Sequence, residues 1–173
     1  MSVPPLRRFI ITAFSLFIGW RLVYDLLLLP DGRVDYFMSI SGVELASYVL
    51  TFLGWEIETS GRLIAQAGSR AVEILNGCNG LQVLGLFSGF IFAYPGNNLK
   101  RIYVMLFGLI VLYFSNIVRI IFFVFVNAQY PDYWNISHSI ITHLFTYPIV
   151  LLIWYWWIVI NEEDVYLSLK MSS

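Results

Sequence analysis

Charged residues and cysteine are scarce in this chain of 173 residues, and their scarcity excludes several classes of protein. Charged residues make up 12% of the sequence, whereas an ordinary soluble domain has about 25%. The net charge of −1 offers no basic surface for nucleic acid. The single cysteine excludes a disulfide framework within the chain and a cysteine-rich zinc site. We find no metal-ligand cluster, phosphate loop or nucleotide motif, and therefore expect no metal and no cofactor.

Apolar and aromatic residues are abundant instead. They make up 59% and 18% of the sequence, which is too much to bury in a core of 20.0 kDa, and the mean hydropathy is +0.75. A helix of about 20 apolar residues crosses the hydrocarbon of a bilayer. Four stretches approach or exceed this length, at roughly 9–29, 81–94, 102–126 and 140–160. The sequence therefore predicts an all-α polytopic membrane protein, with residues 1–173 as a single integral membrane domain.

Basic residues indicate the orientation of these spans, because they favour the cytoplasmic side. Arg7 and Arg8 place the N-terminus inside, and Lys100 with Arg101 places the loop between the second and third spans inside as well. Four spans satisfy both conditions. Tyr36–Trp55, an apolar segment interrupted by polar residues, is then expected to lie in the outer interface or to re-enter from that side. A five-span alternative, in which this segment crosses the bilayer, requires an external N-terminus.

The external stretch of roughly residues 30–79 contains one further predicted element. Trp55–Leu75 does not look helical, and the turn residues Thr59-Ser60-Gly61 lie between short apolar runs. This pattern is typical of a small β-hairpin, here on the outer face. A second external loop is predicted at Asn127–Ser137, with a turn at Tyr130-Pro131-Asp132. The expected fold thus has four to five transmembrane helices, an outer interfacial helix and a small hairpin.

Arg119 is the most informative polar residue, because it falls in the outer third of the third span. A charge at that depth is costly unless it is paired, hydrated or able to snorkel. Asn116 lies on the same helical face. Snorkelling of Arg119 to lipid phosphate is the bland alternative to a functional role.

Cys78 lies in the turn Asn76-Gly77-Cys78-Asn79-Gly80, at the outer entrance of the second span. Glycines at such a place allow the backbone of a substrate to approach closely. The helix N-terminus that follows would favour a thiolate. The alternative reading is that the lone cysteine is a small buried hydrophobic residue.

His138 and His143 are the only histidines, and both lie at the outer entrance of the last span. Either could be a simple polar anchor at the interface. Yet Cys78, Arg119 and a histidine fall at similar depth on three different spans, so helix packing would bring them together. A thiol nucleophile, an imidazole acid–base and a cation for a developing oxyanion form a complete set for acyl transfer.

These motifs together resemble those of the exosortase/archaeosortase family, in a short form. The resemblance rests on Cys78-Asn79-Gly80 opening one span, Asn116-Ile-Val-Arg119-Ile120 inside the next and a histidine opening the last, and covers roughly residues 36–160. It implies a membrane cysteine protease or transpeptidase with Cys78, Arg119 and a histidine as catalytic residues and Asn79, Gly80 and Asn116 in support. His138, nearer the expected level of Cys78, is preferred over His143 as the base.

The resemblance also implies a partner and a location. Such enzymes recognise exported proteins that end in a short motif, one transmembrane helix and a basic cluster, and they pass the cleaved product to an acceptor at the cell surface. The chain would lie in the cytoplasmic (inner) membrane, with its active site facing the extracytoplasmic side. Two other classes compete with this interpretation. One is a small transporter or channel subunit that uses Arg119 as an anion or proton site, and the other is a non-enzymatic membrane assembly factor in which Cys78 is incidental.

Overall fold

The computed structural model describes residues 5–162, and within that range it leaves out the side chains of Pro5, Asn135, Ser139, Ile141, Thr142 and His143. Helices dominate the described chain. The long ones are α1 (Pro5–Val23), α3 (Arg33–Phe52), α4 (Leu81–Ala93), α5 (Asn98–Gln129) and α6 (Trp134–Ile160). The shorter ones are the π-helical η1 (Tyr24–Leu28), which continues α1, then α2 (Leu29–Asp31) and the 3-10 turn η2 (Pro131–Tyr133).

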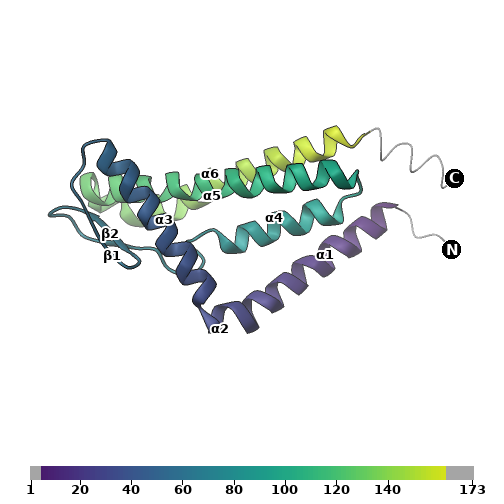
Figure 1. Ribbon diagram of the computed structural model, residues 1–173, viewed down its shortest axis with the longest axis horizontal. Coiled ribbons are helices and arrows are strands. Elements are labelled where there is room, and N and C mark those ends of the chain that lie inside the picture. Colours follow the sequence, from purple (N-terminus) through teal and green to yellow (C-terminus); the bar gives the residue numbers. More distant parts are fainter. Residues whose placement is uncertain (1–4, 163–173) are drawn as a thin grey trace.

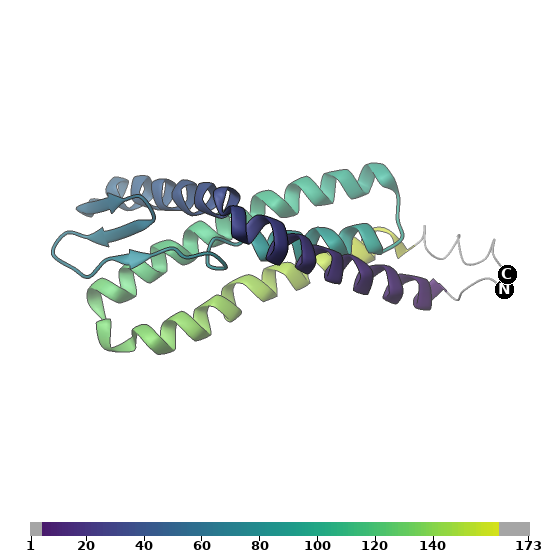
Figure 2. The same cartoon turned by 90° about the horizontal axis from the view of Figure 1, so that it is seen from below.

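The molecule is elongated, and its two ends differ in architecture (Figures 1 and 2). At one end α1, α4 and the adjoining parts of α5 and α6 pack side by side. At the other end α3 and a small sheet pack against the remaining part of α5. The helix α5 is long enough to belong to both ends, so it joins the bundle to the sheet.

The four stretches predicted as spans coincide with α1, α4, α5 and α6. By length and apolar composition, two helices of the described chain could cross a membrane, Leu6–Asp31 and Asn98–Gln129. Leu81–Ala93 and Leu144–Ile160 are shorter apolar helices. The predicted helix at Tyr36–Trp55 is α3, which begins slightly earlier, at Arg33.

The segment predicted to be non-helical forms a three-stranded antiparallel sheet in the order β1-β2-β3. Strand β1 (Ile57–Ser60) pairs with β2 (Leu63–Gln66), and β3 (Val72–Glu73) pairs with the other edge of β2. The turn between β1 and β2 contains Gly61, whose φ of 58° lies in the left-handed region that glycine tolerates best. Strand β3, at the weakly alternating Val72-Glu73, adds a third strand to the pair of strands expected for a hairpin.

Two apolar clusters hold the fold together. The first lies between the sheet, α3 and α5, and contains Ala46, Ile64, Val72 and Ile120 among other buried residues. The second lies between α4, α5 and α6 and is centred on Phe87, Trp157 and their neighbours. A Cβ on Gly108 would overlap the ring of Phe87, so α5 needs a glycine there to pack closely on α4.

The predicted external loop Asn127–Ser137 is wrong in extent. Helix α5 continues to Gln129 and α6 begins at Trp134, so only a short turn separates them. The helices are longer because their ends pack on protein: the Asn127 side chain donates a hydrogen bond to the backbone oxygen of Arg70. His138 therefore lies inside the first turns of α6.

The basic residues used for the orientation lie at one end of the bundle. Arg7 and Arg8 lie in the first turns of α1, and Lys100 and Arg101 in the first turn of α5. The Nζ atom of Lys100 donates to the backbone oxygen of Ile160, at the end of α6, over 3.0 Å. The ends of three helices thus share one basic end, opposite to the sheet (Figure 1).

Candidate active site

Cys78 lies in the turn that precedes α4, partly buried. Gly77 and Gly80 on either side have φ values of 82° and 85°. Other residues rarely adopt this left-handed conformation, so the glycines shape the turn. A Cβ on Gly80 would lie 3.4 Å from Cγ of Asn116, so α5 approaches the turn closely at this point. The structure thus places Cys78 in the turn that the sequence predicts.

Helix α5 holds the backbone of this turn through two side chains. Asn116 Nδ2 donates to the backbone oxygen of Asn79 over 3.1 Å, and Arg119 Nη2 donates to the backbone oxygen of Cys78. Arg119 is only 3% exposed, so it does not snorkel to the surface. Its Nε atom has no hydrogen-bond partner among the described residues. Asn116 and Arg119 share a helical face, as their spacing predicts.

His138 brings the third predicted group to the same place. Its Nε2 atom lies 3.8 Å from Cys78 Sγ. Its ring stacks on Phe123, with centroids 5.2 Å apart and planes at 26°, and contacts Trp134 at 5.6 Å. The guanidinium of Arg119 lies 5.7 Å from the same Phe123 ring. Phe123, which is 1% exposed, therefore packs against both the imidazole and the guanidinium.

The structure thus brings Cys78, Arg119 and His138 together from the turn before α4, from α5 and from α6. His143, the alternative base, lies further along α6, and its side chain is outside the described part of the chain. The choice of base therefore stays a prediction, with His138 as the histidine that contacts the thiol.

Asn79 and Asp35 form a buried polar pair beside the turn. Asn79 Oδ1 accepts from the backbone nitrogen of Leu81 over 3.0 Å, at the start of α4. Its Nδ2 atom donates to Asp35 Oδ1 over 2.6 Å and to the Asp35 backbone oxygen over 3.1 Å. Asp35 was not singled out by the sequence. The signal that could have found it is the helical spacing of Asp35, Ser39, Gly42 and Ala46, all of which are buried on one face of α3.

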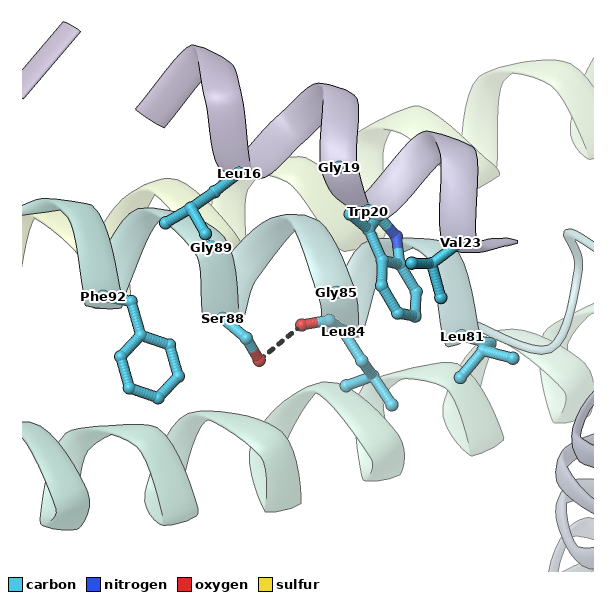
Figure 3. Close-up of a pocket in the computed structure, with 10 residues that line it drawn as sticks. All are labelled: Leu16, Gly19, Trp20, Val23, Leu81, Leu84, Gly85, Ser88, Gly89 and Phe92. Carbon is cyan, nitrogen blue, oxygen red and sulfur yellow. Dashed lines mark hydrogen bonds between the residues drawn. The ribbon is translucent and has the colours of Figure 1, made fainter. Parts of the chain in front are cut away.

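A groove of about 430 Å³ lies between α1 and α4, away from these residues (Figure 3). Its lining is almost wholly apolar, and the hydroxyl of Ser88 donates within α4 to the Leu84 backbone oxygen over 2.8 Å. A Cβ on Gly85 would overlap the Trp20 ring, so α1 packs closely on α4 at this glycine, and the groove lies beside that contact. None of the candidate catalytic residues lines it. Within the described residues, no group of three or more His, Cys, Asp or Glu side chains could hold a metal ion.

The chemistry of the site follows from these contacts. A thiol next to an imidazole can lose its proton to it, and a buried guanidinium nearby can stabilise negative charge on an oxygen. The fold and the site thus define a helical membrane protein with a thiol, an imidazole and a guanidinium gathered where the bundle meets the sheet.

Comparisons with known proteins assign the chain to a family. The model of the transmembrane exosortase family matches residues 6–157, and the chain belongs to that family. The chain is also similar to a curated protein of Methanocaldococcus jannaschii described as a probable archaeosortase D, with 33% identity over 91 residues. That match covers 51% of this chain and 57% of the relative. No solved structure matches the chain. The resemblance stated from the motifs is thereby confirmed at the level of the family.

Proposed function

We propose that this chain is a membrane cysteine peptidase or transpeptidase that cleaves the C-terminal sorting signal of exported proteins. The observation that carries the proposal is the contact of 3.8 Å between Cys78 Sγ and His138 Nε2, with Arg119 bound to the same turn. Three elements far apart in the sequence supply these groups. If the cysteine were incidental, as in an assembly factor, nothing would require an imidazole and a guanidinium to lie beside it.

The proposed reaction has two stages. His138 Nε2 takes the proton of the Cys78 thiol, and the thiolate attacks the carbonyl carbon of the scissile peptide bond. Arg119 stabilises the oxyanion that forms. His138 then gives its proton to the leaving amine, which departs with the C-terminal part of the substrate. The N-terminal part stays as a thioester on Cys78 until the nucleophile of an acceptor, or water, releases it and restores the thiol.

The proposed orientation puts the basic end of the bundle in the cytoplasm and the cysteine turn at the extracytoplasmic side of the inner membrane. Helix α3 turns away from α1 at α2, so that the two form a V, and it lies toward the sheet end instead of beside α1 (Figures 1 and 2). Two helices that do not lie side by side cannot both cross the same bilayer, so this arrangement supports four spans over five. The exposed face of α3 carries Phe37, Tyr48 and Phe52 together with Glu44, and such a mixed apolar and charged face supports contact with the outer interface.

The proposed partner is an exported protein with a short C-terminal motif, one transmembrane helix and a basic cluster. The helix of such a tail would lie in the same bilayer as α1, α4, α5 and α6. Its motif would then emerge at the level of the cysteine turn, where the chain of the substrate is extended and accessible.

The test is to co-express the chain with such a substrate protein and follow its shortening. Cys78→Ala is expected to leave the substrate at full length while the enzyme accumulates normally. A substrate fragment joined to the Cys78 peptide, seen by mass spectrometry in the wild type, would support the thioester. Ser88→Ala is a matched control in the neighbouring helix and is expected to process normally. Wild-type shortening by Cys78→Ala would refute the proposal and favour an assembly factor.

The orientation is tested by labelling in a Cys78→Ala background. Arg70→Cys, in the loop between β2 and β3, is expected to react with a membrane-impermeant thiol reagent added to intact cells. Lys100→Cys, at the other end of α5, is expected to react only after the cells are opened. Protection of the label at position 70 would overturn the proposed orientation.

A further inference from the structure

Asp35 is a buried carboxylate whose position the stability of the fold does not explain. It is 0% exposed, and within the described residues both side-chain hydrogen bonds that it accepts go to Oδ1, from Tyr24 and from Asn79. Its Oδ2 atom has no hydrogen-bond partner in the described part of the chain. Burying such an oxygen is unfavourable, and an apolar residue often replaces a buried polar one without loss of stability. Its neighbours on this face of α3, Val43 and Ala46 among them, are apolar or small.

Helix α1 is distorted where it meets Asp35. The π-helical segment η1 begins at Tyr24, whose side chain is 1% exposed and whose hydroxyl donates to Asp35 Oδ1 over 3.1 Å. Short π-helical insertions of this kind are frequent at functional sites. The distortion is therefore a second observation, independent of the buried carboxylate, that points to the same contact.

The turn that carries Cys78 needs anchors outside itself. Glycine loses more conformational freedom on ordering than any other residue, and this turn has one on each side of the cysteine. Helix α5 holds the carbonyl oxygens of Cys78 and Asn79. Asp35 of α3 holds the side chain of Asn79, over 2.6 Å.

We infer that Asp35 is a positioning residue, which fixes the thiol of Cys78 beside His138 by holding Asn79. The inference rests on the proposed function, since it assigns Asp35 a part in presenting the nucleophile. The separation of 3.8 Å between Cys78 Sγ and His138 Nε2 is near the upper limit for a hydrogen bond to sulfur. A small shift of the turn would therefore break the contact. A misplacement of about 1 Å in a catalytic group can cost about a hundredfold in rate.

The proposed role is geometric and does not need the charge of Asp35. One oxygen, Oδ1, accepts from both Tyr24 and Asn79. In Asp35→Asn the carboxamide oxygen can occupy that place and accept both bonds. The amide nitrogen then takes the place of Oδ2. Rescue by asparagine therefore separates positioning from a role in proton transfer.

The experiment measures the rate at which iodoacetamide alkylates Cys78 in the full-length chain, in native membranes. Asp35→Ala is expected to slow alkylation about tenfold, because a thiol that loses its imidazole partner reacts as an ordinary cysteine. Asp35→Asn is expected to keep most of the wild-type rate. The matched control is Ser39→Ala, because Ser39 is 0% exposed on the same face of α3 and its hydroxyl has no partner among the described residues. This control is expected to react at the wild-type rate.

A double-mutant cycle shows whether the effect runs through the imidazole. In a His138→Ala background, Asp35→Ala is expected to cause no further loss. Tyr24→Phe removes one of the two bonds to Asp35 at almost constant volume, and is expected to give a smaller loss at normal abundance. It replaces Asp35→Ala in the comparison if that variant fails to accumulate.

Three results would overturn the inference: wild-type alkylation in both Asp35→Ala and Tyr24→Phe, an equal loss in Ser39→Ala, or a loss in Asp35→Asn as large as in Asp35→Ala. The second result would mean a general loosening of α3, and the third a role for the charge. Because alkylation needs no substrate, these outcomes are independent of the test of Cys78→Ala in substrate cleavage. If the cleavage test refutes the proposed function, the alkylation rates still show whether Asp35 positions the thiol.

Discussion

Replacing Arg119 by lysine gives the sharpest test of the proposed chemistry. The change keeps a positive charge but removes the planar guanidinium with its five donors. In the structure Nη2 of Arg119 holds the backbone oxygen of Cys78, while Nε has no partner among the described residues. A compact ammonium cannot hold that oxygen and at the same time present a second donor in a fixed direction. We expect Arg119→Lys to be severely impaired in cleavage and close to normal in abundance.

The size of the effect follows from two contributions. Loss of one oxyanion donor typically raises the barrier by about 2.7–4 kcal/mol, which lowers kcat about 10²–10³-fold. Loss of the bond to Cys78 also frees the turn, so the larger end of this range is expected. The decrease in the free energy of unfolding should be smaller than this rise in the barrier, because the buried site keeps its charge and Phe123 still packs against the side chain.

The assay compares the rate of substrate cleavage with the amount of enzyme in the same membranes. Arg21→Lys is the matched control, because Arg21 of α1 pairs with Asp25 of η1 over 2.9 Å and is 47% exposed. Its cleavage rate is expected to equal the wild type. Near-normal cleavage by Arg119→Lys would refute a role for the planar guanidinium, and near-normal cleavage by Arg119→Ala would remove the residue from the mechanism.

Three further substitutions test the nucleophile, the turn and the packing. Cys78→Ser should cleave almost as poorly as Cys78→Ala, since a hydroxyl is a far weaker nucleophile at neutral pH; cleavage at the wild-type rate would contradict this. Gly80→Ala forces a side chain into a left-handed conformation, at a cost of about 1–2 kcal/mol, and should lower cleavage more than abundance. Gly108→Ala should lower Tm in detergent, because overpacking against Phe87 costs about 1–3 kcal/mol. Gly19→Ala, whose Cβ meets nothing within 4 Å, should leave Tm unchanged.

Local features of this protein were readable from the sequence because each depends on nearby residues. Apolar runs located the four long helices that coincide with the predicted spans, and flanking glycines located the turn around Cys78. The period of a helix put Asn116 and Arg119 on one face. Arg21 and Asp25 are four residues apart, and the structure pairs them over 2.9 Å.

Contacts between distant elements were decided only by the tertiary structure. Asp35 was not singled out from the sequence, and it became notable only when α3 buried it against a residue 44 positions away. Likewise the sequence offered two histidines, and packing of α6 on α5 put His138 beside a cysteine 60 positions away. Phe123 was one apolar residue among many in its helix until the fold placed it against an imidazole and a guanidinium. Periodicity reports which face of a helix is buried, but the neighbour of that face depends on how all the helices pack at once.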